Sequence, residues 1–141
     1  MPKRNAYASW TGTLKAGEGS MKLGSGAYEG PFSFKTRFEN EPGTNPEELI
    51  GAALAGCFSM ALAAELEKAG FKPVSVDTDS VTILENTADG PTITTIELNT
   101  KARVEGIDET EFQRIAAATK GGCPVSRALQ GPAVELTATL L

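Results

Sequence analysis

The first third of the chain alternates apolar and polar residues with the period of two that half-buried strands show. Three segments carry the pattern, and they are residues 6–14, 19–26 and 32–39. In the third, Phe32, Phe34 and Phe38 share one face, and Arg37 lies on the opposite, polar face. Glycine-rich breaks separate the segments and are typical of turns. The pattern predicts three strands.

A long apolar helix is expected next. Asn45 suits the N-cap, Pro46 suits the first helical position, and Glu48 completes a capping box. We expect the helix to run to about Ala69, with Gly70 just beyond its end. Its residues are apolar nearly all round and rich in alanine and glycine, so we expect burial on most sides and close approach by other elements.

Two long strands are predicted in the second half of the chain, residues 73–86 and 91–106. The Asp-Gly pair at 89–90 lies between them and suits a hairpin turn. In the first of these strands the apolar phase slips between Val76 and Val81, which predicts a bulge there. The second is cleanly alternating, and its inward residues are Ile96, Leu98, Ala102 and Val104.

The remainder of the chain predicts two helices and a last strand. Asp108 and Glu111 suit a capping box for the first helix, and a short helix opens at Cys123 and Pro124. Residues 133–141 alternate again. Strands with one polar face favour an antiparallel sheet that packs helices on its other face. The sequence therefore predicts one α+β domain, residues 1–141.

Composition narrows the function classes. The 141 residues carry a net charge of −5 and a pI near 4.8, which disfavours a nucleic-acid partner. The N-terminus has no secretory pattern, and no uninterrupted apolar run reaches the ~18 residues that a membrane span needs, so we expect a cytoplasmic protein without a membrane partner. Histidine is absent, which excludes Cys–His and Ser–His–Asp catalysis, and two cysteines alone make a poor metal site.

The two cysteines are the candidate chemical groups, and they lie 123 − 57 = 66 residues apart. Cys57 sits in the apolar helix, where a cysteine is most often an inert core residue. Cys123 stands at the expected N-cap of the short helix, where unpaired N–H groups favour a thiolate, and Arg127 could add positive potential. Local electrostatics alone therefore ranks Cys123 as the more reactive thiol. Taken singly, Arg37 is typical of the solvated face of a strand, and Glu47 is typical of the first turn of a helix.

Several motifs together resemble the OsmC/Ohr family, the osmotically inducible protein C and organic hydroperoxide resistance group. They are "TRFENEPGTNPEELIGAALAGCFSMALA" and the later "GCPVSRAL". The resemblance covers the chain from Ser9 to the final strand and is nearer to the OsmC branch. It implies antiparallel sheets wrapped around a long buried central helix in an intertwined homodimer.

The resemblance also implies roles for four residues. Cys57 would attack a peroxide and become a sulfenic acid, and Cys123 would resolve it to an intramolecular disulfide. Arg37 and Glu47 match the family's active-site arginine and glutamate. This order of attack disagrees with the electrostatic ranking. We follow the family, because an apolar pocket at Cys57 suits a hydrophobic peroxide and Arg37 would offset the desolvation of its thiolate.

The distance along the helix adds a geometric expectation. Ten residues separate Glu47 from Cys57, a rise of about 15 Å in a straight helix. We therefore expect Arg37 and Glu47 to serve Cys57 of the other subunit, so that active sites lie at the subunit interface.

The leading hypothesis is an enzyme that reduces organic hydroperoxides, and hydrogen peroxide less well, in oxidative or osmotic stress defence. It needs no cofactor, and the family implies that electrons come from an external dithiol of the lipoyl type. The alternative is a non-enzymatic binding protein for a hydrophobic ligand, with incidental cysteines. A structural disulfide fits poorly with a chain that lacks a secretory signal.

Overall fold

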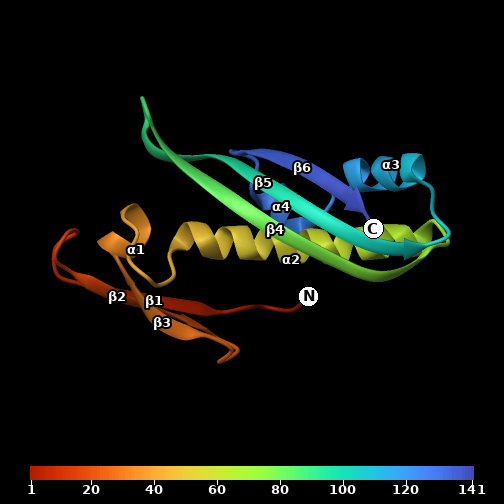
Figure 1. Ribbon diagram of the computed structural model, residues 1–141. Helices are drawn as coiled ribbons and strands as arrows, with labels where there is room; N and C mark the ends of the chain where they lie inside the picture. The colour runs from red at the N-terminus through yellow and green to blue at the C-terminus, as the bar shows by residue number, and fades with distance from the viewer. The chain divides into compact units, whose positions relative to one another are not determined.

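The structure is a computed structural model that describes residues 1–141 (Figure 1). Its contacts divide the chain into two compact units, residues 1–49 and residues 50–141. The first unit contributes one three-stranded sheet, and the second contributes another together with most of the helical residues. Each unit is described by itself below.

The first unit holds strands β1 (Ala6–Thr11), β2 (Glu18–Leu23) and β3 (Glu29–Ser33), followed by the short helix α1 (Phe34–Phe38). The strands pair antiparallel in the order β1-β2-β3. Several large apolar side chains of this unit stay exposed, namely Tyr7, Trp10, Leu14, Leu23 and Phe38. The unit therefore closes no apolar core of its own within one chain.

The expectation of a strand through residues 32–39 is wrong, because the strand stops at Ser33 and α1 begins. Ser33 is the N-cap of α1, and its side chain accepts a hydrogen bond from the Thr36 N–H at 3.2 Å. The Thr36 hydroxyl bonds the Ser33 N–H in return, at 3.0 Å. Because of this reciprocal cap, the segment forms a helical turn although its sequence alternates like a strand. Arg37 therefore lies on a helix and not on the polar face of a strand.

The long helix α2 (Pro46–Lys68) begins and ends close to where the sequence predicts. The Asn45 Oδ1 accepts a hydrogen bond from the Glu48 N–H at 2.8 Å, as an N-cap should. Gly70 follows the helix with a φ of +90°, and the Phe71 N–H bonds the Leu66 carbonyl at 3.0 Å. This is a C-terminal cap in which glycine supplies the left-handed residue.

The second unit is a sheet of β4 (Lys72–Thr87), β5 (Gly90–Glu105) and β6 (Ala133–Leu140), in the order β4-β5-β6. Between β5 and β6 the chain forms α3 (Glu109–Thr119) and α4 (Pro124–Ala128). The β4–β5 hairpin is antiparallel as expected. Strand β6, however, runs parallel to β5, because the helical connection returns the chain to the starting end of β5. The wholly antiparallel expectation is corrected at this strand.

The predicted bulge is in the wrong place. Pairing between β4 and β5 is regular from Val76 to Val81, and the register shifts instead between Pro73 and Ser75 and between Ile83 and Leu84. The alternation of inward and outward side chains along β4 stays constant here, because hydroxyl side chains occupy inward positions and Val81 faces outward. Thr78 shows how such a position is satisfied, since its hydroxyl bonds both Ser59 and Thr100 at 2.7 Å.

The core of the second unit lies between one face of the sheet and the helices. Its buried apolar residues are Leu54, Ala55, Phe58, Leu62, Leu66, Ile96, Leu98, Ala102, Val104, Phe112, Ile115, Ala116 and Cys123. All four inward residues expected on β5 are among them, and the alternate residues Asn99, Lys101 and Arg103 face outward. Burial of this alternating face holds the strand in register.

Helix α2 is buried along only one side within a single chain, contrary to the expectation of burial on most sides. Exposed apolar or small residues on its other side are Ala52, Ala53, Gly56, Met60 and Ala64. The length and apolar composition of α2 would also allow it to cross a membrane, and 33% of its most apolar 18-residue stretch is buried. The expectation that no segment could span a membrane is therefore too strict. The core helix of a soluble protein has the same properties, and α2 supplies five core residues.

Candidate active site

The structure brings Cys57 and Cys123 together within the second unit. Cys57 lies on α2 and is half-buried, whereas Cys123 is the N-cap of α4 and only 1% exposed. Both are free thiols, and their side chains lie close enough for each to shift the pKa of the other. Residues far apart in the sequence thus form a dithiol pair at the edge of the core. Thiols so placed can form an intramolecular disulfide.

The Cys123 sulfur is held by its own turn of chain. It accepts a hydrogen bond from the Ser126 N–H at 3.3 Å, and it lies 3.1 Å from the Ser126 hydroxyl. Ser126 is itself buried. In the usual helix start a serine or aspartate oxygen accepts from this N–H, and here a cysteine sulfur takes that place.

The two thiols have opposite pKa shifts. Burial raises the pKa of Cys57, and its hydrogen bond with Cys123 adds to this, with partial relief from the Val125 N–H. Burial also opposes ionisation of Cys123, but hydrogen bonds from Cys57, from both groups of Ser126 and from the Val125 N–H lower its pKa overall. The chain therefore favours the thiolate on Cys123, in agreement with the local electrostatic argument. The attacking role of Cys57 needs a further positive group near its sulfur.

Arg37 and Glu47 form the second pair of sequence-predicted residues, and both belong to the first unit. The Arg37 guanidinium bonds Glu47 with two nitrogens, Nε at 2.9 Å and Nη2 at 2.8 Å from Oε1. Glu47 is only 7% exposed, whereas the Arg37 side chain is 39% exposed. The bidentate geometry fixes the guanidinium plane, as arginine–carboxylate pairs do. Arg37 also stacks on Phe38, 5.1 Å from the ring centroid.

An apolar cavity of about 220 Å³ lies beside this ion pair in the same unit. Its lining residues are Trp10, Leu14, Phe32, Ser33, Phe34, Arg37 and Phe38. The Trp10 and Phe32 rings lie 5.4 Å apart, and those of Phe34 and Phe38 lie 4.9 Å apart. The cavity thus offers mostly hydrocarbon surface with one cation at its wall, which suits a hydrophobic molecule with a polar end.

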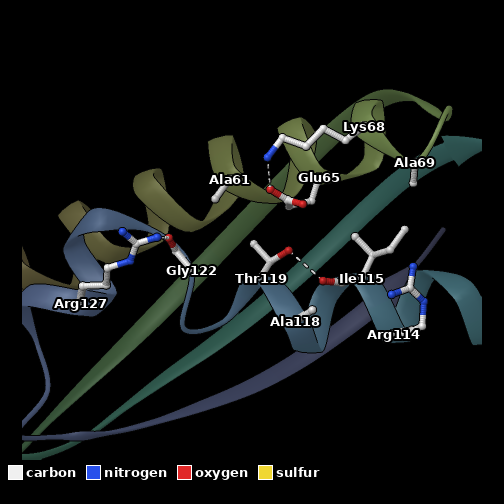
Figure 2. Close-up of a pocket in the computed structure, with 10 residues that line it drawn as sticks. All are labelled: Ala61, Glu65, Lys68, Ala69, Arg114, Ile115, Ala118, Thr119, Gly122 and Arg127. Carbon is white, nitrogen blue, oxygen red and sulfur yellow. Dashed lines mark hydrogen bonds and ion pairs between the residues drawn. The ribbon is translucent and has the colours of Figure 1, made fainter.

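A second cleft, of about 430 Å³, lies between α2, α3 and the segment before α4 (Figure 2). Its cations are already partnered: Lys68 bonds Glu65 at 2.5 Å, Arg114 bonds Glu111 at 2.7 Å, and Arg127 donates to the Gly122 carbonyl at 2.9 Å. Neither cysteine lines this cleft. Although it is the larger of the two, it holds no group suited to peroxide chemistry.

Sequence reasoning missed the contacts that tune the thiols. It ranked Cys123 by its place at a helix start and connected neither Ser126 nor Val125 to the sulfurs. The spacing Cys-x-x-Ser was the available signal, because residues at the N-cap and N3 positions meet in a capping box. No group of three or more acidic or cysteine side chains is arranged to hold a metal ion.

A family model for OsmC-like proteins matches residues 38–137 of this chain. The chain belongs to the OsmC family. This OsmC-family chain is 47% identical over 128 residues to a protein named peroxiredoxin OsmC from Escherichia coli strain K12, with 90% of each chain covered. It is also 32% identical over 91 residues to organic hydroperoxide resistance protein OhrA from Bacillus subtilis strain 168, covering 64% of this chain and 63% of that protein.

Solved structures support the family's fold. The crystal structure of organic hydroperoxide resistance protein OhrB from Bacillus subtilis matches with a TM-score of 0.70 at 20% identity, covering 97% of this chain and 98% of that one. An OsmC-like protein from Mycoplasma pneumoniae matches with a TM-score of 0.75 at 16% identity, covering 99% and 98%. At these identities the likeness establishes the OsmC fold alone.

Proposed function

We propose that Cys57 and Cys123 carry out a thiol-dependent peroxidase reaction that reduces organic hydroperoxides to alcohols. The observation that carries this proposal is that the two free thiols lie close enough for each to shift the pKa of the other. Relatives named as a peroxiredoxin and as an organic hydroperoxide resistance protein support the same reaction. The chain is accordingly a cysteine-based peroxidase. We place it in oxidative or osmotic stress defence, with hydrogen peroxide as a poorer substrate.

Cys57 is the attacking thiol in this proposal. Its thiolate displaces an alcohol from the hydroperoxide and becomes a sulfenic acid, and the alkoxide takes up a proton as it leaves. The Cys123 thiolate then attacks the Cys57 sulfur, and the sulfenic oxygen departs as water. The greater exposure of Cys57 supports this order, since a bulky peroxide has to reach the sulfur that it oxidises.

Arg37 supplies the positive charge that Cys57 lacks. Burial raises the pKa of Cys57, and a guanidinium near its sulfur would favour the thiolate. Glu47 holds that guanidinium in a fixed plane through the bidentate contact. Glu47 lies in the first turn of α2 and Cys57 ten residues further along, a rise of about 15 Å. We therefore assign the Arg37–Glu47 pair to Cys57 of the partner subunit.

The exposed face of α2 supports a homodimer with such shared sites. It presents alanine, glycine and methionine, and Met60 has an exposed fraction of 78%. The first unit likewise exposes aromatic residues and buries no apolar side chain. Surfaces of this kind are normally covered by a partner. We propose that a second copy of the chain covers both and that residues 1–141 act as one OsmC-like domain within that dimer.

The aromatic cavity beside Arg37 is the proposed site for the organic part of the hydroperoxide. Its rings would bind the hydrocarbon, and Arg37 would bind the peroxide oxygens as charge develops on them. Hydrogen peroxide cannot use the apolar surface, so it gains less from binding. No cofactor is required in this scheme. An external dithiol of the lipoyl type, acting in the cytoplasm, returns the two electrons.

A direct experiment tests the reaction. Reduced protein is treated with one equivalent of cumene hydroperoxide, free thiols are alkylated, and intact masses are recorded for the wild type, Cys57→Ser and Cys123→Ser. We expect an intramolecular disulfide in the wild type and a sulfenic acid at Cys57 in the Cys123→Ser variant. A sulfenic acid on Cys123 in the Cys57→Ser variant alone would reverse the roles. Two unreacted thiols in the wild type would contradict the proposal.

The alternative, a binding protein with incidental cysteines, is not favoured. It gives no reason for two free thiols to lie close enough to shift each other's pKa, or for the relatives' names to describe peroxide chemistry.

A further inference from the structure

The two sulfurs differ in accessibility and in what holds them. The Cys57 side chain is half-buried, whereas Cys123 is 1% exposed. The Cys123 sulfur is contacted by both polar groups of Ser126, the N–H at 3.3 Å and the hydroxyl at 3.1 Å. The Ser126 hydroxyl shares a hydrogen bond with this sulfur, in which either atom can be the donor. In a disulfide between Cys57 and Cys123, the Cys57 sulfur is therefore the more accessible one, and the Cys123 sulfur is the one stabilised by hydrogen bonds.

We propose that Ser126 is a positioning residue that holds Cys123 as the leaving thiolate when a dithiol reduces the Cys57–Cys123 disulfide, so that the donor attacks Cys57. This inference rests on the proposed function, which supplies the disulfide and the external dithiol. It adds the direction of the reducing step and a residue that sets it.

The electrons balance in two exchanges. A donor thiolate attacks the Cys57 sulfur, a bond forms between these two atoms, and the Cys57–Cys123 bond breaks with its electron pair leaving on Cys123. The donor's second thiolate then attacks the donor sulfur of the mixed disulfide and forms the donor's own disulfide. Cys57 leaves as a thiolate and takes up a proton. The donor loses two electrons, and the enzyme regains two reduced cysteines.

Thiol–disulfide exchange favours this direction for two reasons. The attacking thiolate has to approach along the axis of the sulfur–sulfur bond, and Cys57 is the more exposed of the two residues. The exchange is also faster when the departing sulfur is the more acidic thiol. When Cys123 becomes a thiolate, the Ser126 hydroxyl can only donate to it, and together with the N–H it supplies two donors to the new charge.

The route of the substrate supports the same assignment. In the proposed reaction a hydroperoxide reaches Cys57 from outside the core, so an opening to this sulfur exists before the disulfide forms. The donor needs no second opening if it attacks the same atom. Attack on Cys123 would require the chain around α4 to move, because that sulfur is enclosed by Ser126 and the core.

A mapping experiment identifies the attacked sulfur. The full-length protein is oxidised with diamide, which forms the disulfide without any peroxidase step, and is then mixed with a monothiol such as 2-mercaptoethanol. After rapid alkylation, trypsin separates Cys57 in residues 38–68 from Cys123 in residues 121–127. We expect the mixed disulfide on Cys57 and the alkyl group on Cys123. The reverse labelling would overturn the proposal.

A variant series tests Ser126. In Ser126→Ala we expect the second-order rate of disulfide reduction by dihydrolipoate to fall about three- to tenfold, and Ser126→Thr to recover part of it, because the hydroxyl is restored. Ser59→Ala is the matched control, since it removes a hydroxyl that bonds Thr78 and not a thiol. Equal rates in Ser126→Ala and the wild type, or equal losses in Ser126→Ala and Ser59→Ala, would overturn the proposal.

A titration separates a charge effect from a folding effect. In the Cys57→Ser background, thiolate absorbance reports Cys123 alone, and adding Ser126→Ala should raise the pKa of Cys123. An unchanged pKa would contradict the stabilising role. Because diamide replaces the peroxide throughout, a protein that fails to react with hydroperoxide would still give these results. Failure of the proposed function and failure of this inference are thereby distinguished.

Discussion

The two units of this chain differ in the reactive groups that they hold and in whether they enclose an apolar core. Residues 50–141 enclose a core and hold both thiols, each of which shifts the pKa of the other. Residues 1–49 hold the Arg37–Glu47 ion pair beside an aromatic cavity, yet Glu47 is the one buried side chain there. The two cysteines thus belong to the unit that encloses its own apolar core. The Arg37–Glu47 pair, which is proposed to activate Cys57, belongs to the unit whose apolar side chains stay exposed in a single chain. This contrast is what a site shared between two subunits would produce.

The largest effect is expected at the thiols. Cys57→Ser should lower steady-state hydroperoxide turnover about a thousandfold or more, because the remaining thiol, Cys123, is buried and a hydroperoxide does not reach it. Cys123→Ser should keep the first turnover and lose disulfide formation. Peroxide consumption with a dithiol donor measures the former, and mass spectrometry measures the latter. Comparable turnover in Cys57→Ser and the wild type would assign the chemistry elsewhere.

The next largest effect is expected at the ion pair. Arg37→Ala should slow the first turnover about a hundredfold at neutral pH, because burial raises the pKa of Cys57 and its thiolate then forms only at higher pH. The midpoint of the pH–rate profile should therefore move upward in this variant. Lys35→Ala removes a neighbouring cation of α1 and serves as the control. Equal profiles for both variants would show that Arg37 does not act on the thiolate.

A charge on the open face of α2 should break the dimer. In Met60→Lys we expect half the wild-type mass by light scattering, since a lysine would be buried without a partner in the interface. Trypsin should then cleave the first unit fastest, at Lys15, Lys22 or Lys35, because it loses its cover. Thr137→Lys, exposed on β6, is the control. A Met60→Lys protein with unchanged mass would place the interface elsewhere.

The smallest effect concerns the inner face of β4. Thr82 has a buried hydroxyl without a hydrogen-bond partner, so Thr82→Val should raise the free energy of unfolding by about 1 kcal/mol. Thr78→Val should lower it by a similar or larger amount, about 1–2 kcal/mol, since its hydroxyl bonds Ser59 and Thr100. Urea unfolding of both variants measures the difference. Shifts of the same sign would contradict this account of the hydroxyls.

Most elements could be predicted from the sequence because their signals are local. Asn45 and Gly70 mark the ends of α2, and the Asp-Gly pair marks the β4–β5 hairpin. The failures have local causes too. Phe34 and Phe38 are four residues apart, which fits the face of a helix as well as that of a strand, and the Ser33 cap decides between them. The alternation of β6 is the same whether it pairs parallel or antiparallel, so its direction could not be predicted.

The candidate site could be predicted only in part. The 66 residues between the cysteines encode no contact, and their pairing came from the resemblance to the OsmC/Ohr family. The effect of Val125 on Cys57 depends on how the turn at α4 meets α2, which no pattern in one segment records, whereas the contact of Ser126 with Cys123 lies within a single Cys-x-x-Ser turn. The acidity of Cys123 was accessible from sequence, because a cysteine followed by proline at a helix start has predictable N–H neighbours.

The measurement that tests the central claim most directly is complementation between two inactive chains. Cys57→Ser and Arg37→Ala proteins are unfolded, mixed in equal amounts and refolded together, and hydroperoxide turnover is compared with each protein alone. If Arg37 serves Cys57 of the partner subunit, half of the dimers are hybrids with one intact site each, and about a quarter of the wild-type activity should return. If Arg37 serves the Cys57 of its own chain, no hybrid holds an intact site, and the mixture would stay as inactive as its components.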